Sequence, residues 1–204
     1  MNKKTVWITG ASSGIGQEFA RQYARLGFRL ILTARRKDRL DALAEELQNR
    51  YHVPCRVLPA DLERDVDCEA LCTVLAAERI DLFINNAGFG ISGAVEFTKT
   101  EDAQHQLDVN FFGMVRMNRQ VLPGMRRQCY GRIVNLSSVA GAIPIPFQTY
   151  YSASKAAINS YTMALANEVK PFGIQVCCVQ PGDIRTGFTA AREKTVTGDE
   201  VYGG

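Results

Sequence analysis

Short apolar runs alternate with longer amphipathic stretches along most of the chain. The runs are rich in Val, Ile and Leu, mostly end in Gly, Pro, Asn or Ser, and have the length of buried β-strands. They occupy residues 4–10, 28–34, 54–60, 81–88, 131–138 and 173–182. The amphipathic stretches 16–27 and 39–51 have helical spacing. We expect Asp38 to cap the start of the second helix and Gly27 to end the first.

Alternation of strand and helix patterns predicts the fold class. Repeated βαβ units give a doubly wound parallel sheet of the Rossmann-like α/β class, with helices on both faces in three α/β/α layers. We count six strands, because nothing after Phe188 has a strand pattern. The chain shows no internal repeat, linker or low-complexity tract, so we expect one dinucleotide-binding domain over residues 1–204.

Composition narrows the class of partner. Hydrophobic residues make up 46% and charged residues 22% of the chain, and the formal net charge is +3. This balance offers no electrostatic reason to bind nucleic acid or an anionic membrane. The apolar runs are too short for a membrane span, and the start of the sequence lacks the apolar core of a signal peptide. We therefore expect a cytoplasmic protein.

Cysteine and histidine usage does not predict a metal site. None of the six cysteines forms a C-x-x-C pair, and the chain has two histidines. Cys177 and Cys178 lie in a predicted strand, where we expect them to be buried as small hydrophobic residues. His52 and His105 have no partner motif and are interpreted as surface or structural residues.

A glycine-rich loop, TGASSGIG, follows the first predicted strand and leads into the first predicted helix. Glycines permit a tight turn and a close approach of backbone to phosphate, and the helix N-terminus supplies free N–H groups. Gly10, Gly14 and Gly16 have the spacing G-x-x-x-G-x-G, which differs from the common G-x-G-x-x-G. The loop could be a structural turn, but its position between strand and helix favours dinucleotide phosphate binding.

The end of the second predicted strand indicates which dinucleotide is bound. NAD-binding folds usually place an acidic residue there to bond the adenosine ribose. Here Arg35 and Arg36 occupy that place and no acid is present. Guanidinium groups bind a 2′-phosphate, whereas a carboxylate repels one. The alternative is that both arginines only begin a solvated helix. The pattern favours NADP(H) as the cofactor.

Two adjacent tyrosines precede a lysine in the stretch TYYSASK. In a helix, Tyr151 and Lys155 share a face because they are four residues apart, whereas Tyr150 points about 140° away from the lysine. Such a pair is often only a surface contact. If it is catalytic, the ammonium can lower the tyrosine pKa from its usual value of about 10 by ~1–3 units. Tyr150 is interpreted as a packing or pocket-wall residue.

Taken together, several motifs resemble those of the short-chain dehydrogenase/reductase family. They are TGASSGIG, Asp61–Leu62, the NNAG stretch at 85–88, Asn110, Ser137–Ser138, YSASK and PGDIRT. They occur in the family's order and at its intervals over essentially the whole chain. One YxxxK motif would be weak, but the joint occurrence is specific.

The resemblance implies a catalytic set of Asn110, Ser138, Tyr151 and Lys155. Tyr151 is implied to be the general acid/base, Lys155 to lower its pKa and bond the nicotinamide ribose, Ser138 to polarise the substrate oxygen, and Asn110 to hold a water in a proton relay. Asp61 is implied to bond the adenine amino group, Asn86 and Gly88 to support the nicotinamide side, and Thr186 to meet the carboxamide. The implied cofactor-binding residues are Gly10, Ser12, Ser13, Gly14, Ile15, Gly16, Arg35, Arg36, Asp61, Leu62, Asn86, Ala87, Gly88, Tyr151, Lys155, Pro181, Gly182, Ile184 and Thr186.

Two further interpretations concern the residues that precede Tyr151. Ser137 and Ser138 cannot both face one carbonyl, because neighbouring strand residues point in opposite directions, and the family interval selects Ser138. The stretch GAIPIPFQ, residues 141–148, is apolar. It is equally consistent with a substrate pocket wall and with a buried loop.

The preferred interpretation is an NADP(H)-dependent enzyme that interconverts a ketone or aldehyde and an alcohol. One alternative is a sensor or scaffold that binds NADP(H) without turnover, and another is a methyltransferase, which has no use for YxxxK. The resemblance implies a homodimer or homotetramer. It also implies a C-terminal substrate helix and a seventh strand, which we do not find in this sequence; such a chain would leave its sixth strand as an open edge.

Overall fold

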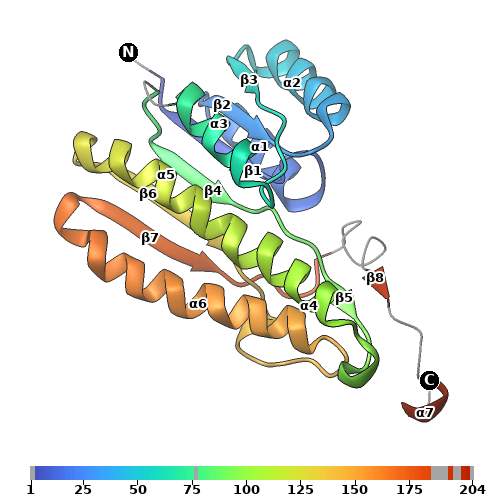
Figure 1. Cartoon of the computed structure of the whole chain (residues 1–204). Helices are drawn as coiled ribbons and strands as arrows, with labels where there is room; N and C mark the ends of the chain where they lie inside the picture. Colours follow the sequence, from blue (N-terminus) through green and yellow to red (C-terminus); the bar gives the residue numbers. More distant parts are fainter. Residues whose placement is uncertain (1–2, 76–77, 185–192, 195–198, 203–204) are drawn as a thin grey trace.

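Six parallel strands form the centre of the molecule (Figure 1). The computed structural model describes residues 3–75, 78–184, 193–194 and 199–202. The strands are β3 (Cys55–Val57), β2 (Arg29–Thr33), β1 (Thr5–Thr9), β4 (Leu82–Asn85), β6 (Gly131–Leu136) and β7 (Ile174–Val179), in that spatial order. Every neighbouring pair is parallel. The predicted six-stranded doubly wound sheet is confirmed, and its order reverses between β1 and β4, where such folds bind ligands.

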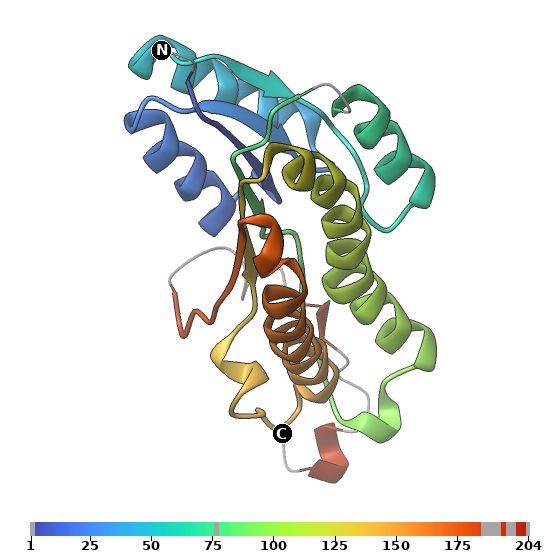
Figure 2. The same ribbon diagram turned by 90° about the vertical axis from the view of Figure 1, so that its left-hand side faces the viewer.

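Helices cover the sheet in two layers. On one face lie α1 (Gly14–Arg25) and α2 (Lys37–Tyr51), and on the other lie α3 (Asp65–Leu75), α5 (Gly113–Gln128) and α6 (Thr149–Val169). Figure 2 shows α5 and α6 side by side, on the side of the sheet away from α1. Helix α4 (Thr100–Leu107) precedes α5. This is the three-layer arrangement that the alternating pattern predicts.

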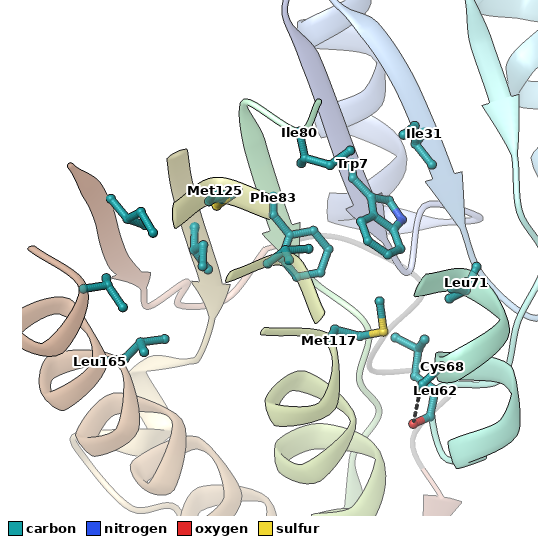
Figure 3. Packing of buried hydrophobic residues seen from close by; sticks show 14 of the residues in the cluster. Trp7, Ile31, Leu62, Cys68, Leu71, Ile80, Phe83, Met117, Met125 and Leu165 are labelled. Atoms are coloured by element: carbon teal, nitrogen blue, oxygen red, sulfur yellow. Dashed lines mark hydrogen bonds between the residues drawn. The ribbon is translucent and has the colours of Figure 1, made fainter. Parts of the chain in front are cut away.

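Strand alternation divides the core between these layers. On β1, Val6 and Ile8 belong to the apolar cluster beneath α1 and α2, and Trp7 belongs to the cluster beneath α3, α5 and α6. The Trp7 and Phe83 ring centroids are 4.9 Å apart (Figure 3). The buried indole N–H donates a hydrogen bond of 2.8 Å to Thr33 Oγ1, so the largest core side chain leaves no polar group unsatisfied.

Helix α2 begins earlier than the sequence pattern predicts. Its N-cap is Arg36, in extended conformation, and Asp38 lies in the first turn. The prediction of Asp38 as the cap is therefore wrong; its carboxylate lies near the positive end of the helix dipole. The expected end of α1 is confirmed, because Gly27 follows the helix with φ +81°, a left-handed conformation that favours glycine.

The last strand of the main sheet is half exposed, which contradicts the prediction for its cysteines. Cys177 is exposed and Cys178 only half-buried. Because β7 is an edge strand, its residues on the α6 side are covered and those on the α1 side are not. A groove of about 380 Å³ lies on that uncovered side, near the amino ends of the strands. Its lining includes Tyr23, Phe28, Tyr130, Arg132, Gln175 and Cys177.

A second, very small sheet was not predicted. It pairs β5 (Ile91–Ser92) with β8 (Glu193–Lys194) in parallel, so a strand does occur after Phe188. Two residues are too few to show a period of two, and the pairing joins segments far apart in the sequence. The remaining short elements are η1 (Val95–Phe97), η2 (Asp108–Phe112), η3 (Val139–Gly141), η4 (Lys170–Phe172) and α7 (Asp199–Tyr202).

Candidate active site

Four predicted motifs meet at the carboxyl edge of the sheet. The glycine loop follows β1, residues 86–88 follow β4, Ser138 lies two residues after β6, and Pro181 follows β7 by two residues. Parallel strands end at the same edge, so these segments converge although they are far apart in the sequence. The register confirms this: β1 pairs with β4, β4 with β6 and β6 with β7.

The glycine loop is held by the segment after β4. Gly10 has φ +64° and Gly14 φ +56°, left-handed conformations that favour glycine. Asn86 Nδ2 donates to the carbonyl oxygens of Thr9 and Gly10 at 3.1 and 3.2 Å. A Cβ added at Gly10 would lie 2.7 Å from that nitrogen. The Asn86 side chain therefore fixes the loop itself, while its predicted role beside the nicotinamide stays a prediction.

The donor groups around this loop fit dinucleotide phosphates. The extended Ser13 precedes α1 and makes no side-chain capping bond, so the first-turn N–H groups of the helix are not capped by it. Arg36 Nη2 lies 3.2 Å from Ser12 Oγ and 3.1 Å from Ser13 Oγ. The exposed Arg36 thus brings its guanidinium beside two hydroxyls and a helix N-terminus, which together suit an anion. Arg35 is exposed next to it.

The loop after β3 contains the predicted adenine contact. The half-buried Asp61 accepts a hydrogen bond from the Glu63 backbone N–H at Oδ1, 3.2 Å away. The Asp61 N–H donates to Asp67 Oδ2 at 2.9 Å. Leu62 is buried in the apolar cluster beneath α3 and α5. The bond from the Glu63 N–H orients the Asp61 side chain, and the bond to Asp67 fixes the Asp61 backbone.

Tyr151 and Lys155 lie one turn apart at the start of α6, as predicted. Tyr151 is 9% and Lys155 6% exposed, and Lys155 Nζ lies 5.6 Å from the Tyr151 ring centroid. The ammonium donates a hydrogen bond of 2.8 Å to the Leu136 carbonyl at the end of β6. Burial lowers the pKa of Lys155 from its ordinary 10.5 to about 8.

The two serines after β6 have different environments. Ser137 Oγ donates to the Lys155 carbonyl oxygen at 2.9 Å, so that hydroxyl faces the α6 backbone. Ser138 is half-buried, and its Oγ accepts from the Ala140 N–H at 3.1 Å and donates to the Pro181 carbonyl at 3.5 Å. Of the pair, Ser137 is committed to anchoring α6, which favours Ser138 for contact with a substrate.

Asn110 lies in η2, a π-helical turn between α4 and α5. Its Oδ1 accepts from the Phe89 N–H at 3.0 Å, and its Nδ2 donates to the Phe89 carbonyl at 3.0 Å and to Ser154 Oγ at 3.2 Å. These bonds use both amide hydrogens and one lone pair of Oδ1. A Cβ added at Gly88 would lie 2.9 Å from Asn110 Oδ1 and 3.8 Å from Lys155 Nζ.

A small cavity adjoins Asn110. Its volume is about 10 Å³, close to the minimum that one water molecule needs. Leu136, whose carbonyl accepts from Lys155, also lines it. The predicted water relay therefore has a space of suitable size beside Asn110. The Asn110 side chain itself mainly holds the Phe89 backbone and Ser154.

The loop after β7 is only partly described. Pro181 accepts a hydrogen bond from the Val139 N–H at 3.0 Å, which joins this loop to the segment after Ser138. Gly182 and Ile184 are exposed. Thr186, the predicted carboxamide contact, lies outside the described residues.

Three further sequence interpretations can be compared with the structure. The stretch from Ala142 to Phe147 is exposed, so its interpretation as a buried loop is wrong. Tyr150 is half-buried. His105 is half-buried as well: its Nδ1 lies 2.7 Å from Glu63 Oε1, and its ring packs against Phe89 at 4.8 Å between centroids, a structural role.

Two residues of the site were not predicted. Ser154 accepts from Asn110 and donates to the Tyr151 carbonyl at 2.7 Å, which links η2 to α6. Thr9 Oγ1 accepts from the backbone N–H groups of Asn86 and Ala87 at 3.0 and 3.2 Å. Ser154 could have been found because it shares the Tyr151 face at i+3. The Thr9 contact depends on strand pairing and has no local signal.

Within the described part of the chain, no group of three or more His, Cys, Asp or Glu side chains could hold a metal ion. None of the helices described there is both long and apolar enough to cross a bilayer.

Known proteins share both the sequence and the fold. Residues 4–197 match the short chain dehydrogenase family. The chain is 41% identical over 194 residues to a 3-ketodihydrosphingosine reductase of Bacteroides thetaiotaomicron, covering 94% of this chain and 68% of that protein. It spans from 61% to 70% of the length of three such curated relatives.

Solved structures agree with this assignment. A short-chain dehydrogenase from Sphingobium yanoikuyae in complex with NADPH superposes with a TM-score of 0.87 at 39% identity, covering 91% of this chain and 73% of that one. An NAD+-bound xylitol dehydrogenase superposes with a TM-score of 0.84 at 29% identity, covering 89% and 70%. The chain belongs to the short-chain dehydrogenase/reductase family of oxidoreductases.

Proposed function

We propose that this chain catalyses the NADP(H)-dependent interconversion of a ketone or aldehyde and an alcohol, with Tyr151 as the general acid/base. The observation that carries the proposal is the buried Lys155 ammonium, held by the Leu136 carbonyl one helical turn from the Tyr151 ring. A buried cation is costly and is retained where its charge is used. Gly88 borders the same place, because a Cβ added there would lie 3.8 Å from Lys155 Nζ.

Each residue of the site has a separate role in the proposed reaction. When bound, the nicotinamide supplies the hydride that the carbonyl carbon accepts. The Ser138 hydroxyl donates a hydrogen bond to the carbonyl oxygen, and the Tyr151 phenol transfers its proton to that oxygen, so that the alcohol is formed. The Lys155 ammonium stabilises the resulting phenolate. A water beside Asn110 would return the proton from solvent.

Turnover by the Tyr151→Phe variant tests this function. The loss of NADPH absorbance with a panel of ketones is measured for both proteins. Because Phe has no proton to give, we expect kcat to fall by roughly 10²–10⁴-fold. The Kd for NADPH should change little, since the glycine loop and Arg36 are untouched.

Tyr150→Phe is the matched control, because it removes the neighbouring phenol, which points away from Lys155 in the helix. It should retain turnover. Equal turnover in the Tyr151 variant would contradict the assigned role. Tight NADPH binding without turnover of any carbonyl compound would instead support a sensor or scaffold.

The preference for NADP(H) is supported by Arg36. Its guanidinium lies beside Ser12 and Ser13 at the start of α1, where a 2′-phosphate would gain charged hydrogen bonds. The Sphingobium relative binds NADPH and the xylitol dehydrogenase binds NAD+. Membership of the family therefore does not decide between NADP(H) and NAD(H), and the preference is inferred from this chain's own residues.

Arg36→Ala is predicted to weaken NADPH binding selectively. The loss of a charged hydrogen bond should cost about 1.5–3 kcal/mol of binding free energy, which is a 10- to 150-fold rise in the Kd for NADPH. The Kd for NADH should change little. Titration by intrinsic fluorescence measures both constants. Arg39→Ala, which removes an exposed charge from the same helix, is the control. Equal losses for the two cofactors would remove the 2′-phosphate argument.

The single-domain assignment, the homodimer or homotetramer and the cytoplasmic location remain predictions. The small-molecule carbonyl or alcohol substrate is part of the proposal above.

A further inference from the structure

Six consecutive apolar residues, Ala142 to Phe147, are exposed between Ser138 and Tyr151. The exposed fractions are 68% for Ile143, 40% for Ile145 and 49% for Phe147. Water-facing loops are normally polar, and an exposed apolar run of this length indicates a binding function. We call residues 142–147 the apolar loop. Its side chains belong to neither of the two apolar core clusters in the described part of the chain.

The backbone of the apolar loop is well fixed. The Ile143 N–H donates to the Val139 carbonyl at 2.8 Å, and the Ile145 N–H donates to Ser152 Oγ at 3.2 Å. The Phe147 carbonyl accepts from the Gly93 N–H at 2.8 Å, and Phe147 itself has φ +60°, an uncommon conformation for a large residue. Pro144 and Pro146 restrict the chain further. A ligand that lies on this surface therefore loses little loop entropy on binding.

Apolar surface continues on both sides of the loop. Val139 is 39% exposed and follows Ser138 directly, and its Cγ2 would lie 3.9 Å from a Cβ at Gly182. At the other end, the ring centroids of Phe147 and Tyr202 are 5.8 Å apart. Figures 1 and 2 both show the loop and α7 at the same end of the molecule. A molecule whose carbonyl reaches Ser138 and Tyr151 would thus meet apolar surface beyond the reacting atoms.

We propose that the carbonyl substrate carries an extended apolar group, which lies along Val139 and the apolar loop. This inference rests on the proposed carbonyl reduction and adds the class of substrate. Residues 139–150 contain no charged side chain. Membrane-surface segments are typically basic, so this composition favours an apolar substrate over a bilayer as the partner. The favourable binding free energy from apolar contact increases in proportion to the apolar area that is removed from water.

A homologous series of methyl ketones, from 2-butanone to 2-decanone, tests the inference. For the wild-type protein with NADPH, we expect kcat/KM to rise with each added methylene. The upper limit is about fourfold per methylene, which corresponds to about 0.8 kcal/mol per buried CH2 group. In the variant Ile143→Ser/Ile145→Ser, the rise per methylene should be much smaller, because the chain then meets polar side chains.

Leu26→Ser is the matched control. Leu26 is 69% exposed, like Ile143, but ends α1 at the amino edge of the sheet, and its variant should keep the wild-type dependence on chain length. Circular dichroism checks that each variant is folded.

The outcomes separate this inference from the proposed function. Turnover of 2-butanone with no rise along the series would overturn the inference alone. No turnover of any ketone would overturn both. In the third outcome, the wild-type protein floats with lipid vesicles, the double variant does not, and the dependence on chain length is the same for both. That result would assign the surface to a bilayer and reject the substrate proposal.

Discussion

At the scale of single residues, Lys155 has the most consequential environment. Its ammonium is buried, its pKa is lowered to about 8 by that burial, and a backbone carbonyl and an aromatic ring are the groups placed to compensate. A lysine with a pKa near neutral pH can change its own protonation when Tyr151 gains or loses a proton. A fully exposed lysine would respond far less. Sequence spacing predicted the pair, but the burial comes from packing of α6 against β6 and η3.

The lowered pKa of Lys155 makes stability depend on pH. Between pH 8 and 10.5 the unfolded chain binds this proton and the folded chain does not, so the Lys155 contribution to stability rises with pH and is lost as pH falls through about 8. Relative to Lys155→Met, the wild-type free energy of unfolding should increase by about 2 kcal/mol from pH 7 to pH 9.5. Urea unfolding without cofactor measures it.

Equal m-values for the two proteins would show that the same surface is exposed on unfolding. A difference between the proteins that stays constant over this pH interval would contradict the buried, low-pKa lysine.

At the scale of elements, the proposed catalytic residues lie on segments that are held by close backbone contacts. Gly141 in η3 packs directly on α6: an added Cβ would lie 2.7 Å from the Lys155 carbonyl carbon and 2.9 Å from the Ala156 nitrogen. The turn that carries Ser138 is therefore docked against the helix that carries Tyr151 and Lys155. Both elements must keep this separation for the proposed proton transfer, because misplacement by about 1 Å can cost 10²-fold in rate.

Alanine at Gly141 should disturb both stability and catalysis. Overpacking against backbone atoms is expected to cost about 1–3 kcal/mol of unfolding free energy and to lower kcat, as η3 and α6 move apart. Gly124→Ala in α5 is the matched control, because a Cβ there meets nothing within 4 Å. That variant should be more stable than wild type by up to about 1 kcal/mol. Chemical unfolding and steady-state kinetics measure the two effects, and an unaffected Gly141 variant would refute the close docking.

At the scale of the whole molecule, the two faces of the sheet are covered unequally. Three helices cover one face across the sheet, whereas α1 and α2 cover the other over β1 to β4 and leave much of β6 and β7 uncovered. The remaining face of β6 and β7 borders the groove of about 380 Å³. The candidate active site lies at the opposite end of the strands, where the order reverses between β1 and β4. The large groove is thus separate from the proposed catalytic residues.

Local periodicity was sufficient for the fold class and for the positions of the six main strands along the chain. Each strand and helix carries its own pattern of apolar positions, and the glycine loop, Arg36 and the Tyr151–Lys155 spacing are local features as well. Parallel topology then requires their convergence at one edge. The start of α2 and the two-residue strands were missed, because boundaries and very short pairings have little local signal.

Burial and partner choice depended on contacts between distant segments. The exposure of Cys177 follows from its place on an edge strand, and the exposure of the apolar loop follows from its position beyond the packed elements. Likewise, Ser137 bonds to the α6 backbone and Asn110 bonds to Phe89 because of tertiary packing. The sequence by itself determines the chemistry of each residue and the periodicity of its segment. The burial and the hydrogen-bond partners of a residue are decided only by the tertiary structure, because they come from segments that are far apart in the sequence.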